Sequence, residues 1–194
     1  MGSSQSEKAA SHERIVRSAS ARIRRDGIDN VTVSDLMGEA GLTHGGFYRH
    51  FDSREELIAE AVEAALEHGA RRTAKVAVPD GADPLATIID GYLSERHRDR
   101  PDAGCAVAVL ATDIARSSPR ARKAYSEQVR RSIELLAGLL SEDEPIAARE
   151  HAQLLLAALV GALSLARAVD DPELSDQILA GTARALRNNV DPSA

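Results

Sequence analysis

TVSDLMGEAGLTHGGFYRHF, residues 32–51, predicts two short helices joined by a tight turn. Thr32 can cap the first helix through its hydroxyl, and Asp35 three residues later completes a capping box. Gly41 supplies the left-handed residue that ends this helix, and Thr43 can cap a second helix at once. A helix, a glycine turn and a second helix at this spacing are typical of the helix-turn-helix motif, whose second helix enters the major groove of DNA.

The second helix has one apolar side and one polar side. Phe47 and Phe51, at positions i and i+4, share the apolar side and are expected to be buried. The opposite side is left to His44, Gly45, Tyr48 and Arg49. His44 and Arg49 are the candidates for contacts with base edges, where an arginine suits guanine. Gly45 would let the backbone come close to DNA, because a Cβ atom there would collide.

A second capping box begins directly after this helix. Ser53 and Glu56 have the S-x-x-E spacing, which predicts the start of a long helix. With this box included, GLTHGGFYRHFDSREEL, residues 41–57, resembles the DNA-reading segment of the TetR family of bacterial transcription regulators. The specific part of the resemblance covers residues 15–60, about a quarter of the chain, and only the helical layout extends it further.

The resemblance implies further contacts with the DNA backbone. Tyr48 matches a tyrosine whose hydroxyl points to a phosphate, a core position being the alternative. His50 and Arg54 match phosphate-contacting positions, and Thr43 can meet a phosphate at the helix N-terminus. Gly46 departs from the family, which commonly has a small hydroxyl residue there, and two adjacent glycines should each weaken the helix by about 1 kcal/mol. The predicted DNA-binding residues are Ser34, Thr43, His44, Gly45, Gly46, Tyr48, Arg49, His50 and Arg54.

Charge and composition fit a soluble DNA-binding protein. The 194 residues are 43% hydrophobic and 28% charged, and the net charge is −6. Residues 8–51 carry seven Lys and Arg against five Asp and Glu, which gives +2, so the rest of the chain carries about −8. The positive charge is thus concentrated where the groove-reading helix is, and the acidic remainder would keep DNA away from the rest of the surface.

Other sequence features argue for a cytoplasmic protein. Cys105 is the single cysteine, which excludes an intrachain disulfide and favours a reducing compartment. The longest apolar run, residues 154–166, is shorter than the roughly 18 residues of a membrane span and is expected to be a buried helix. The N-terminal MGSSQS fits a myristoylation pattern, but a disordered leader is the preferred interpretation. We therefore expect no membrane contact.

Apolar periodicity predicts an all-α chain of about nine helices. Residues 1–10 are expected to be a disordered leader, residues 11–52 a three-helix DNA-binding head, and residues 53–194 a helical body for ligand binding and dimerisation. Caps, prolines and apolar spacing place helices at 11–26, 53–75, 84–98, 105–116, 118–140, 145–169 and 172–188, besides the two of the motif. No catalytic motif, cofactor motif or cluster of metal ligands is found in the sequence.

The body is expected to dimerise and to hold a ligand, as the resemblance implies. One helix-turn-helix reads too few base pairs for a genome, so a twofold dimer on a palindrome is the usual solution. The predicted interface is Leu155, Leu159, Ala162, Leu163, Ala166, Ile178, Leu179 and Leu186, on an apolar helical surface that also includes Leu154, Ala158 and Gly161, the alternative being that these residues only fill the protomer core. The predicted ligand-binding residues are Leu85, Ile89, Tyr92, Leu110, Ile114, Tyr125 and Leu159, which suit a small hydrophobic ligand.

Three further body residues have two interpretations each. Arg116 and Arg167 are placed within hydrophobic helices and could pair with an anionic ligand, but ion pairs with Asp113 or Asp170 are preferred. Cys105 could be a redox switch, and a small buried hydrophobic residue is the preferred alternative.

The sequence thus predicts a ligand-responsive transcription regulator without enzymatic activity. We expect a dimeric repressor that holds a palindromic operator in double-stranded DNA and is released when the ligand moves the helix that begins at residue 53. Two other functions stay open: a sequence-tolerant architectural DNA-binding protein, and a DNA-binding head fused to a small-molecule enzyme. The acidic body argues against an architectural protein, because sequence-independent DNA binding needs many contacts between basic side chains and phosphates.

Overall fold

The computed structural model describes residues 5–73, 80–140 and 144–190, and every regular element in them is helical. The prediction of an all-α chain is confirmed. In chain order the α-helices and the two short 3-10 helices (η) are α1 (Gln5–Asp26), α2 (Val33–Glu39), η1 (His44–Arg49), α3 (Arg54–Thr73), α4 (Pro84–Tyr92), α5 (Glu95–Arg98), η2 (Pro101–Ala103), α6 (Ala106–Ile114), α7 (Pro119–Ala137), α8 (Pro145–Ala168) and α9 (Pro172–Val190).

α1 is longer than predicted. It begins at Gln5 instead of residue 11, so residues 5–10, which were expected in the disordered leader, are helical. The first four residues of that leader lie outside the described part of the chain. Glutamine, glutamate, lysine and alanine all favour helices, and Glu7 in the first turn complements the helix dipole. Local propensity therefore extends α1 beyond its apolar stripe.

Two other elements differ from their predicted form. The predicted helix 84–98 is divided into α4 and α5, because the Ser94 hydroxyl accepts a hydrogen bond from the His97 amide (3.2 Å) and caps a new helix. The second helix of the motif is the 3-10 helix η1, which agrees with the weak helix propensity of Gly45 and Gly46. The remaining helix ends lie within three residues of the predicted ones.

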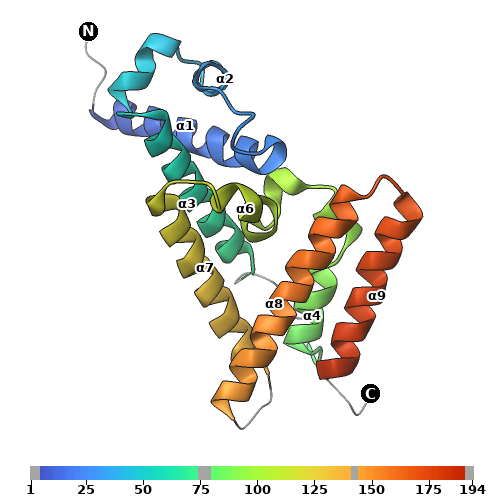
Figure 1. Ribbon diagram of the computed structural model, residues 1–194. Helices are drawn as coiled ribbons and strands as arrows, with labels where there is room; N and C mark the ends of the chain where they lie inside the picture. The colour runs from blue at the N-terminus through green and yellow to red at the C-terminus, as the bar shows by residue number, and fades with distance from the viewer. Residues whose placement is uncertain (1–4, 74–79, 141–143, 191–194) are drawn as a thin grey trace.

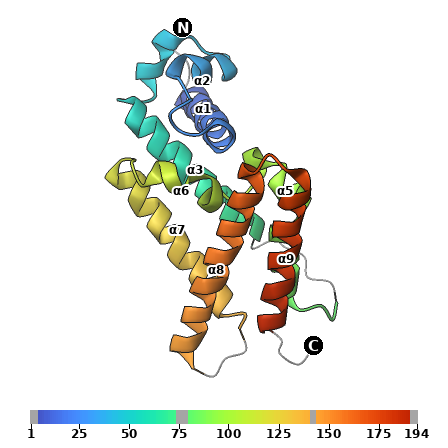
Figure 2. The same ribbon diagram turned by 45° about the vertical axis from the view of Figure 1, so that its right-hand side comes forward.

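The helices form a head and a body (Figure 1). The head consists of α1, α2 and η1 and lies at the end of the molecule opposite to the C-terminus, and α3 leads from it into the body. The body consists of α3 to α9. In it α7 lies along α3, α8 packs on α7, and α9 returns antiparallel to α8 (Figure 2). α3 is thus the helix that connects the DNA-binding motif with the rest of the protein.

One apolar core joins the head to the body. Phe47 and Phe51 of the head belong to the same cluster of buried side chains as Leu57 of α3 and Leu110 and Ile114 of α6. A second cluster fills the space between α4, α8 and α9. Because the first cluster is continuous and close-packed, a displacement of α3 or α6 reaches the head through side chains in contact.

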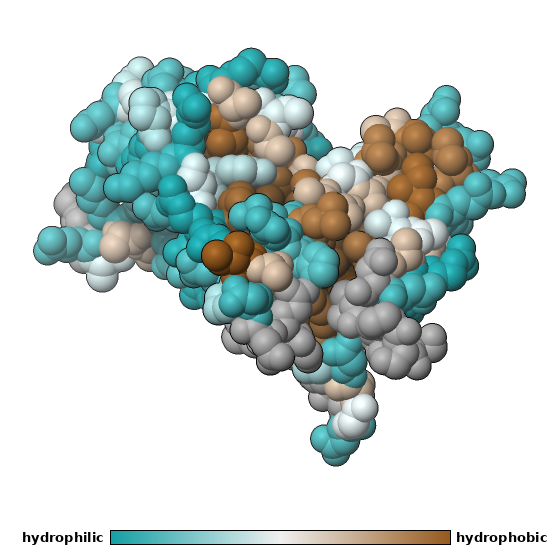
Figure 3. All heavy atoms as spheres, turned by 60° about the horizontal axis from the view of Figure 1, so that its bottom comes forward, coloured by the Kyte–Doolittle hydropathy of each residue, from teal (hydrophilic) through white to brown (hydrophobic). Residues whose placement is uncertain are grey.

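α8 is buried on one side and exposed on another. The buried side carries Leu155, Leu159 and Leu163. Leu154 and Leu165, on the neighbouring stripe, are 65% and 58% exposed, and Leu174 of α9 is 42% exposed. Figure 3 shows apolar side chains gathered on the side of the molecule where α8 and α9 lie. By length and composition α8 would also suit a membrane span, a property that core helices of soluble proteins share, and here its buried leucines hold the body together.

Most of the residues predicted for the dimer interface lie beneath the exposed stripe. Six of the eight predicted residues are buried inside the protomer, namely Leu155, Leu159, Ala162, Leu163, Ala166 and Leu179. The other two, Ile178 and Leu186, are half-buried. An apolar period identifies a buried face but not the element that covers it, and the protomer's own helices cover this one. The apolar stripe beside it on α8 is one residue earlier at each turn, with Leu154 and Leu165 exposed and Ala158 and Gly161 half-buried.

Candidate nucleic-acid interface and body cavity

The predicted cap and turn form the first half of the motif. Thr32 Oγ1 accepts a hydrogen bond from the Asp35 amide at 3.2 Å and caps α2. Gly41 follows α2 with a φ of +72°, a conformation that glycine adopts without strain. The Leu42 amide then donates to the Met37 carbonyl at 2.8 Å, which closes the turn. The chain thereby leaves α2 in the direction that η1 requires.

Phe47 and Phe51 hold η1 against the head. Each side chain is 2% exposed, and their ring centroids lie 5.6 Å apart. His12 of α1 stacks on Phe51 with ring centroids 4.5 Å apart, and its Nε2 lies 2.7 Å from Glu60 Oε2 of α3. η1 is therefore fixed between three helices although it is only six residues long. His12 is absent from the sequence prediction because its partners are distant along the chain.

The outer side of the motif is exposed. The exposed residues of the predicted set are Ser34, Thr43, His44, Gly45, Tyr48 and Arg49. Tyr48 is 72% exposed, which excludes the core alternative and leaves its hydroxyl in solvent. Thr43 precedes η1 in an extended conformation, and its side chain makes no capping hydrogen bond. Gly46 is different, because it is half-buried and a Cβ atom there would lie 3.6 Å from Met37 Cε of α2.

Arg54 is half-buried and is bonded to the loop of the head that precedes α2. The predicted capping box is present, with the Glu56 amide donating to Ser53 Oγ at 3.1 Å. The Nη2 of Arg54 donates to the carbonyl oxygens of Ile28 (2.8 Å) and Val31 (3.1 Å). The side chain that was predicted to contact a phosphate thus ties the start of α3 to the loop before α2. Sequence spacing could not reveal this role, because the two carbonyls lie more than 20 residues earlier.

His50 is also partly withdrawn from the surface. It is half-buried beside Phe51, with ring centroids 6.3 Å apart, and its Nδ1 is buried without a hydrogen-bond partner among the described residues. Burial lowers the pKa of His50, and the positive charges of His12, Lys8 and Arg49 add to the shift. The ring therefore favours its neutral form in the free protein.

Ion pairs fix α1 to α2. Arg22 of α1 pairs with three carboxylates, those of Asp26, Asp35 and Glu39. Two of these carboxylates belong to α2, so the pairs set the angle between the helices that support η1. Arg22 is thereby committed to the structure of the head, whereas Arg49 extends the outer edge of η1 as an exposed cation.

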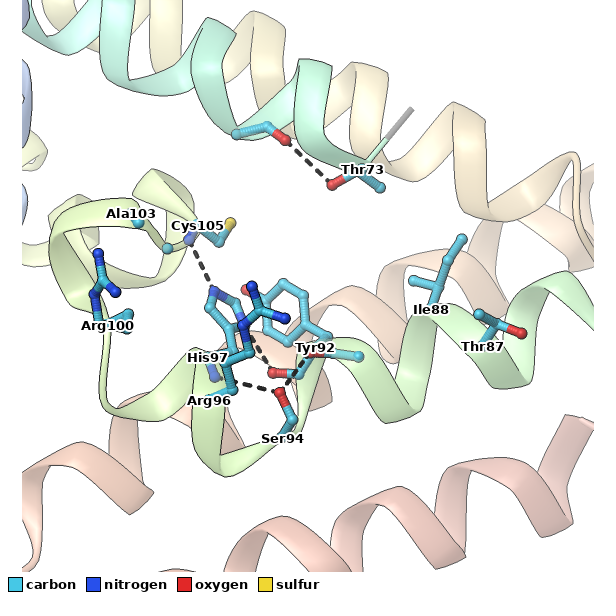
Figure 4. Close-up of a pocket in the computed structure, with 13 residues that line it drawn as sticks. Thr73, Thr87, Ile88, Tyr92, Ser94, Arg96, His97, Arg100, Ala103 and Cys105 are labelled. Atoms are coloured by element: carbon cyan, nitrogen blue, oxygen red, sulfur yellow. Dashed lines mark hydrogen bonds between the residues drawn. The ribbon is translucent and has the colours of Figure 1, made fainter. Parts of the chain in front are cut away.

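A cavity of about 530 Å³ opens in the body between α3, α4 and the segment from α5 to the start of α6 (Figure 4). Tyr92 alone of the predicted ligand-binding residues lines it. The apolar members of that set, Leu85, Ile89, Leu110, Ile114 and Leu159, are buried in the two core clusters. Tyr125 is half-buried beside the first cluster, and its hydroxyl donates to the Val107 carbonyl at 2.9 Å. The cavity is lined by polar side chains together with glycines and apolar groups, many of them near helix ends, which an apolar period does not mark.

The residues with two interpretations are also placed. Arg116 forms the preferred ion pair with Asp113, with the two side chains 3.6 Å apart. Arg167 forms no ion pair with Asp170 in the described part of the chain and donates to two backbone carbonyls instead. Cys105 is half-buried at the start of α6 and lines the cavity.

Two family models match the chain. The model described as "Bacterial regulatory proteins, tetR family" matches residues 15–61, and the model described as "Transcriptional regulator LmrA/YxaF-like, C-terminal domain" matches residues 81–178. The chain is 30% identical to Rv0196 of Mycobacterium tuberculosis strain H37Rv, an uncharacterized HTH-type transcriptional regulator, over 91% of this chain and 92% of that protein. YfiR of Bacillus subtilis, an uncharacterized regulator of the same type, is 31% identical over 42% of this chain and 38% of its own length.

Solved structures have the same fold. A TetR transcriptional regulator from Chloroflexus aurantiacus superposes with a TM-score of 0.77 at 24% identity and covers 94% of this chain and 97% of its own. The reduced form of E. coli NemR superposes with a TM-score of 0.75 at 20% identity and covers 93% of this chain and 97% of its own. Both likenesses extend over the head and the body together.

Proposed function

The chain belongs to the TetR family of transcriptional regulators, and we propose that it is a dimeric repressor that holds a palindromic operator until a small ligand binds its body. DNA binding and transcription regulation follow from the family, which is non-enzymatic. Repression, the dimer, the palindrome and the ligand are the proposed additions. We also propose that residues 11–52 form the DNA-binding domain, that residues 53–194 form the ligand-binding and dimerisation domain, and that the protein acts in the cytoplasm.

The exposed edge of η1 is the observation that carries the proposal. His44, Tyr48 and Arg49 project from a short helix whose opposite side is held by buried phenylalanines. A polar edge on a fixed helix suits the major groove, where Arg49 would read a guanine. The hydroxyl of Tyr48 and that of Thr43 suit phosphates on either side of the groove. One surface thus carries both the side chains proposed to contact DNA bases and those proposed to contact the DNA backbone.

The exposed stripe of α8 and α9 is the proposed dimer surface. It carries the exposed leucines Leu154, Leu165 and Leu174. Above Gly161 of α8 and Gly181 of α9 the space is open, so a partner helix can approach closely. Two copies of this pair of helices would pack as four helices about a twofold axis. The two η1 helices then need a separation of about 34–36 Å to enter successive major grooves on one face of DNA.

The helix α3 and two hydrogen bonds connect the head with the body around the cavity and support release by a ligand. α3 begins at the head and ends at Thr73, which lines the cavity. Arg24 of α1 is 5% exposed, and its Nη1 donates to the carbonyl of Gly104 (3.4 Å), another lining residue. The Ile28 amide donates to Asp113 Oδ2 of α6 at 2.9 Å. A ligand that moves the cavity wall changes these contacts, and DNA and ligand then weaken each other's binding equally.

Selection of binding sites from a genomic DNA pool, followed by footprinting, tests the proposal. We expect a palindrome with half-sites about one helical turn apart, protected symmetrically on both strands. In fluorescence anisotropy this site should bind at least about 1,000-fold more tightly than a scrambled duplex. Equal affinity for both duplexes would refute the palindromic operator and favour an architectural role.

A further inference from the structure

The described lining of the body cavity is basic. Arg96, His97 and Arg100 belong to it, and none of the described residues that line it is Asp or Glu. Arg100 is paired with Asp102 at 3.2 Å. Arg96 is exposed and pairs with no carboxylate in the residues that the structure describes. The electrostatic balance of the cavity therefore favours an anion.

Behind this lining, Arg167 of α8 is a half-buried cation that forms no ion pair with a carboxylate in the described residues, although the charge of Asp99 acts on it. Its Nε donates to the Arg98 carbonyl (3.0 Å) and its Nη2 to the His97 carbonyl (2.6 Å), while its Nη1 is buried and has no partner within the described ranges. Burial lowers the pKa of Arg167. A Cβ atom at Gly104 would lie 3.0 Å from Arg167 Nη2, so only the absence of a side chain there lets the guanidinium reach the cavity wall. A cation taken out of water is costly unless an anion compensates it.

Tyr92 supplies a second unmatched donor, at the cavity itself. Its hydroxyl is buried and has no conventional hydrogen bond to the described residues, and the neighbouring Cys105 thiol is only a weak partner. Burial raises the pKa of Tyr92 well above its usual value, so the hydroxyl stays protonated and keeps its ability to donate. The His97 ring lies 2.7 Å from the Tyr92 carbonyl and accepts from the Cys105 amide at 2.9 Å, which fixes this end of the cavity (Figure 4).

We propose that this end of the cavity binds the carboxylate of a small organic acid. Tyr92 Oη and Arg96 donate to the carboxylate, and Arg167 compensates its charge from behind Gly104. The apolar part of the acid lies along Ile88 and the Tyr92 ring, which also line the cavity. This assignment rests on the proposed function, in which a ligand of the body releases the operator, and it names the class of that ligand. A ligand that is hydrophobic throughout would leave both buried donors unmatched.

Isothermal titration calorimetry of the full chain without DNA tests the site. The probes are benzoate, hexanoate and octanoate, each compared with its primary amide, which has nearly the same shape but no charge. We expect at least one acid to bind about tenfold or more tightly than its amide, because hydrogen bonds to an ionised acceptor are the stronger ones. The proposal is overturned if the amides bind as tightly as the acids, or if no acid binds in the millimolar range.

Two tyrosine variants provide a matched pair. Tyr92→Phe removes a hydroxyl without a conventional partner, so we expect an unchanged or higher Tm and about tenfold weaker binding of the acid. Tyr125→Phe removes a hydroxyl that donates to the Val107 carbonyl outside the cavity lining, so the Tm should fall while the acid affinity stays the same. Arg96→Gln, at an exposed position, should weaken the acid and not the amide. Unchanged acid affinity in both Tyr92→Phe and Arg96→Gln would overturn the proposal.

Anisotropy with the selected operator separates this site from the proposed function. If the acids bind with the expected pattern but the operator stays bound, the ligand-release function fails and the carboxylate site stands. If amides release the operator as effectively as acids, the release function stands and the carboxylate site fails.

Discussion

The head and the body of this regulator use packing in opposite ways. In the head, Phe47 and Phe51 fill the space behind η1, and the side chains proposed to contact DNA are exposed on the other side. In the body, the Tyr92 hydroxyl and Nη1 of Arg167 are buried without a conventional partner among the described residues, Tyr92 at the cavity wall and Arg167 behind it. A surface that reads DNA needs complete packing behind it to hold its geometry, whereas a ligand site needs packing that is left incomplete.

The double variant Tyr48→Ala, Arg49→Ala tests the outer side of the head and should have the largest effect. Both side chains are exposed, so their removal leaves the core intact and the Tm nearly unchanged. Operator affinity should fall about 100-fold or more, because each half-site loses a base contact and a phosphate contact. Anisotropy on the operator measures the loss. The control Arg122→Ala removes an exposed arginine of α7 and should change nothing, and an unaffected double variant would show that η1 is not the reading element.

Gly161→Arg tests the outer side of the body. An arginine in the middle of the proposed dimer stripe should give a monomer in light scattering and lower operator affinity at least about tenfold, because one protomer reads only half of the palindrome. The fold itself should tolerate the change, since space above Gly161 is open and arginine favours a helix over glycine by roughly 0.5–1 kcal/mol. Ser126→Arg on the exposed side of α7 is the matched control. A Gly161→Arg protein that remains dimeric would place the interface elsewhere.

The turn of the head and the packing behind it could be predicted from the sequence because their determinants are local. The Thr32 cap, the left-handed Gly41 and the spacing of Phe47 and Phe51 act within one short stretch, and each has its expected geometry. The contacts that escaped prediction join residues that are distant in the chain. Arg54 reaches carbonyls that precede the motif, and His12 reaches Glu60 of α3.

The body could be predicted as a set of helices but not as a set of sites. Periodicity shows that a side of α8 is apolar, but not whether the protomer or a partner covers it. Leu155 and Leu163 are therefore core residues, and the partly exposed stripe is one residue earlier. The cavity forms where Ser94 interrupts the predicted helix 84–98, at polar helix ends that have no apolar period. Of the predicted ligand-binding residues, Tyr92 alone lines the cavity.

Arg54→Lys separates structural support from DNA contact within the head. Lysine keeps the positive charge but lacks the planar guanidinium that reaches the carbonyls of Ile28 and Val31. We expect the free energy of unfolding in urea to fall by about 1.5–3 kcal/mol, the range for hydrogen bonds that involve a charged group. Operator affinity should change less than about threefold, because Arg54 is expected to support the head and not to contact DNA. Unchanged stability in Arg54→Lys, combined with lost operator affinity in Arg54→Met, would instead make Arg54 a DNA contact.

His50 should give the smallest effect, a pH dependence that differs between free and DNA-bound protein. Its pKa is lowered by burial in the folded head, so as the pH falls below about 6.5 the unfolded chain takes up a proton before the folded one does. The contribution of His50 to stability is therefore fully present above about pH 6.5 and decreases as the pH falls towards the lowered folded-state pKa. Urea unfolding across this range should show a steeper loss of stability for the unchanged protein than for His50→Gln, and parallel profiles would contradict the assignment.

DNA binding gives a second test of His50, because a phosphate beside the ring favours its charged form. If His50 contacts DNA, operator binding near pH 6 should take up a fraction of a proton in the unchanged protein but not in His50→Gln. Calorimetry in buffers of different ionisation enthalpy measures this uptake. Equal proton uptake by the two proteins would make His50 a packing residue, and Tyr48 and Thr43 would remain the proposed phosphate contacts of η1.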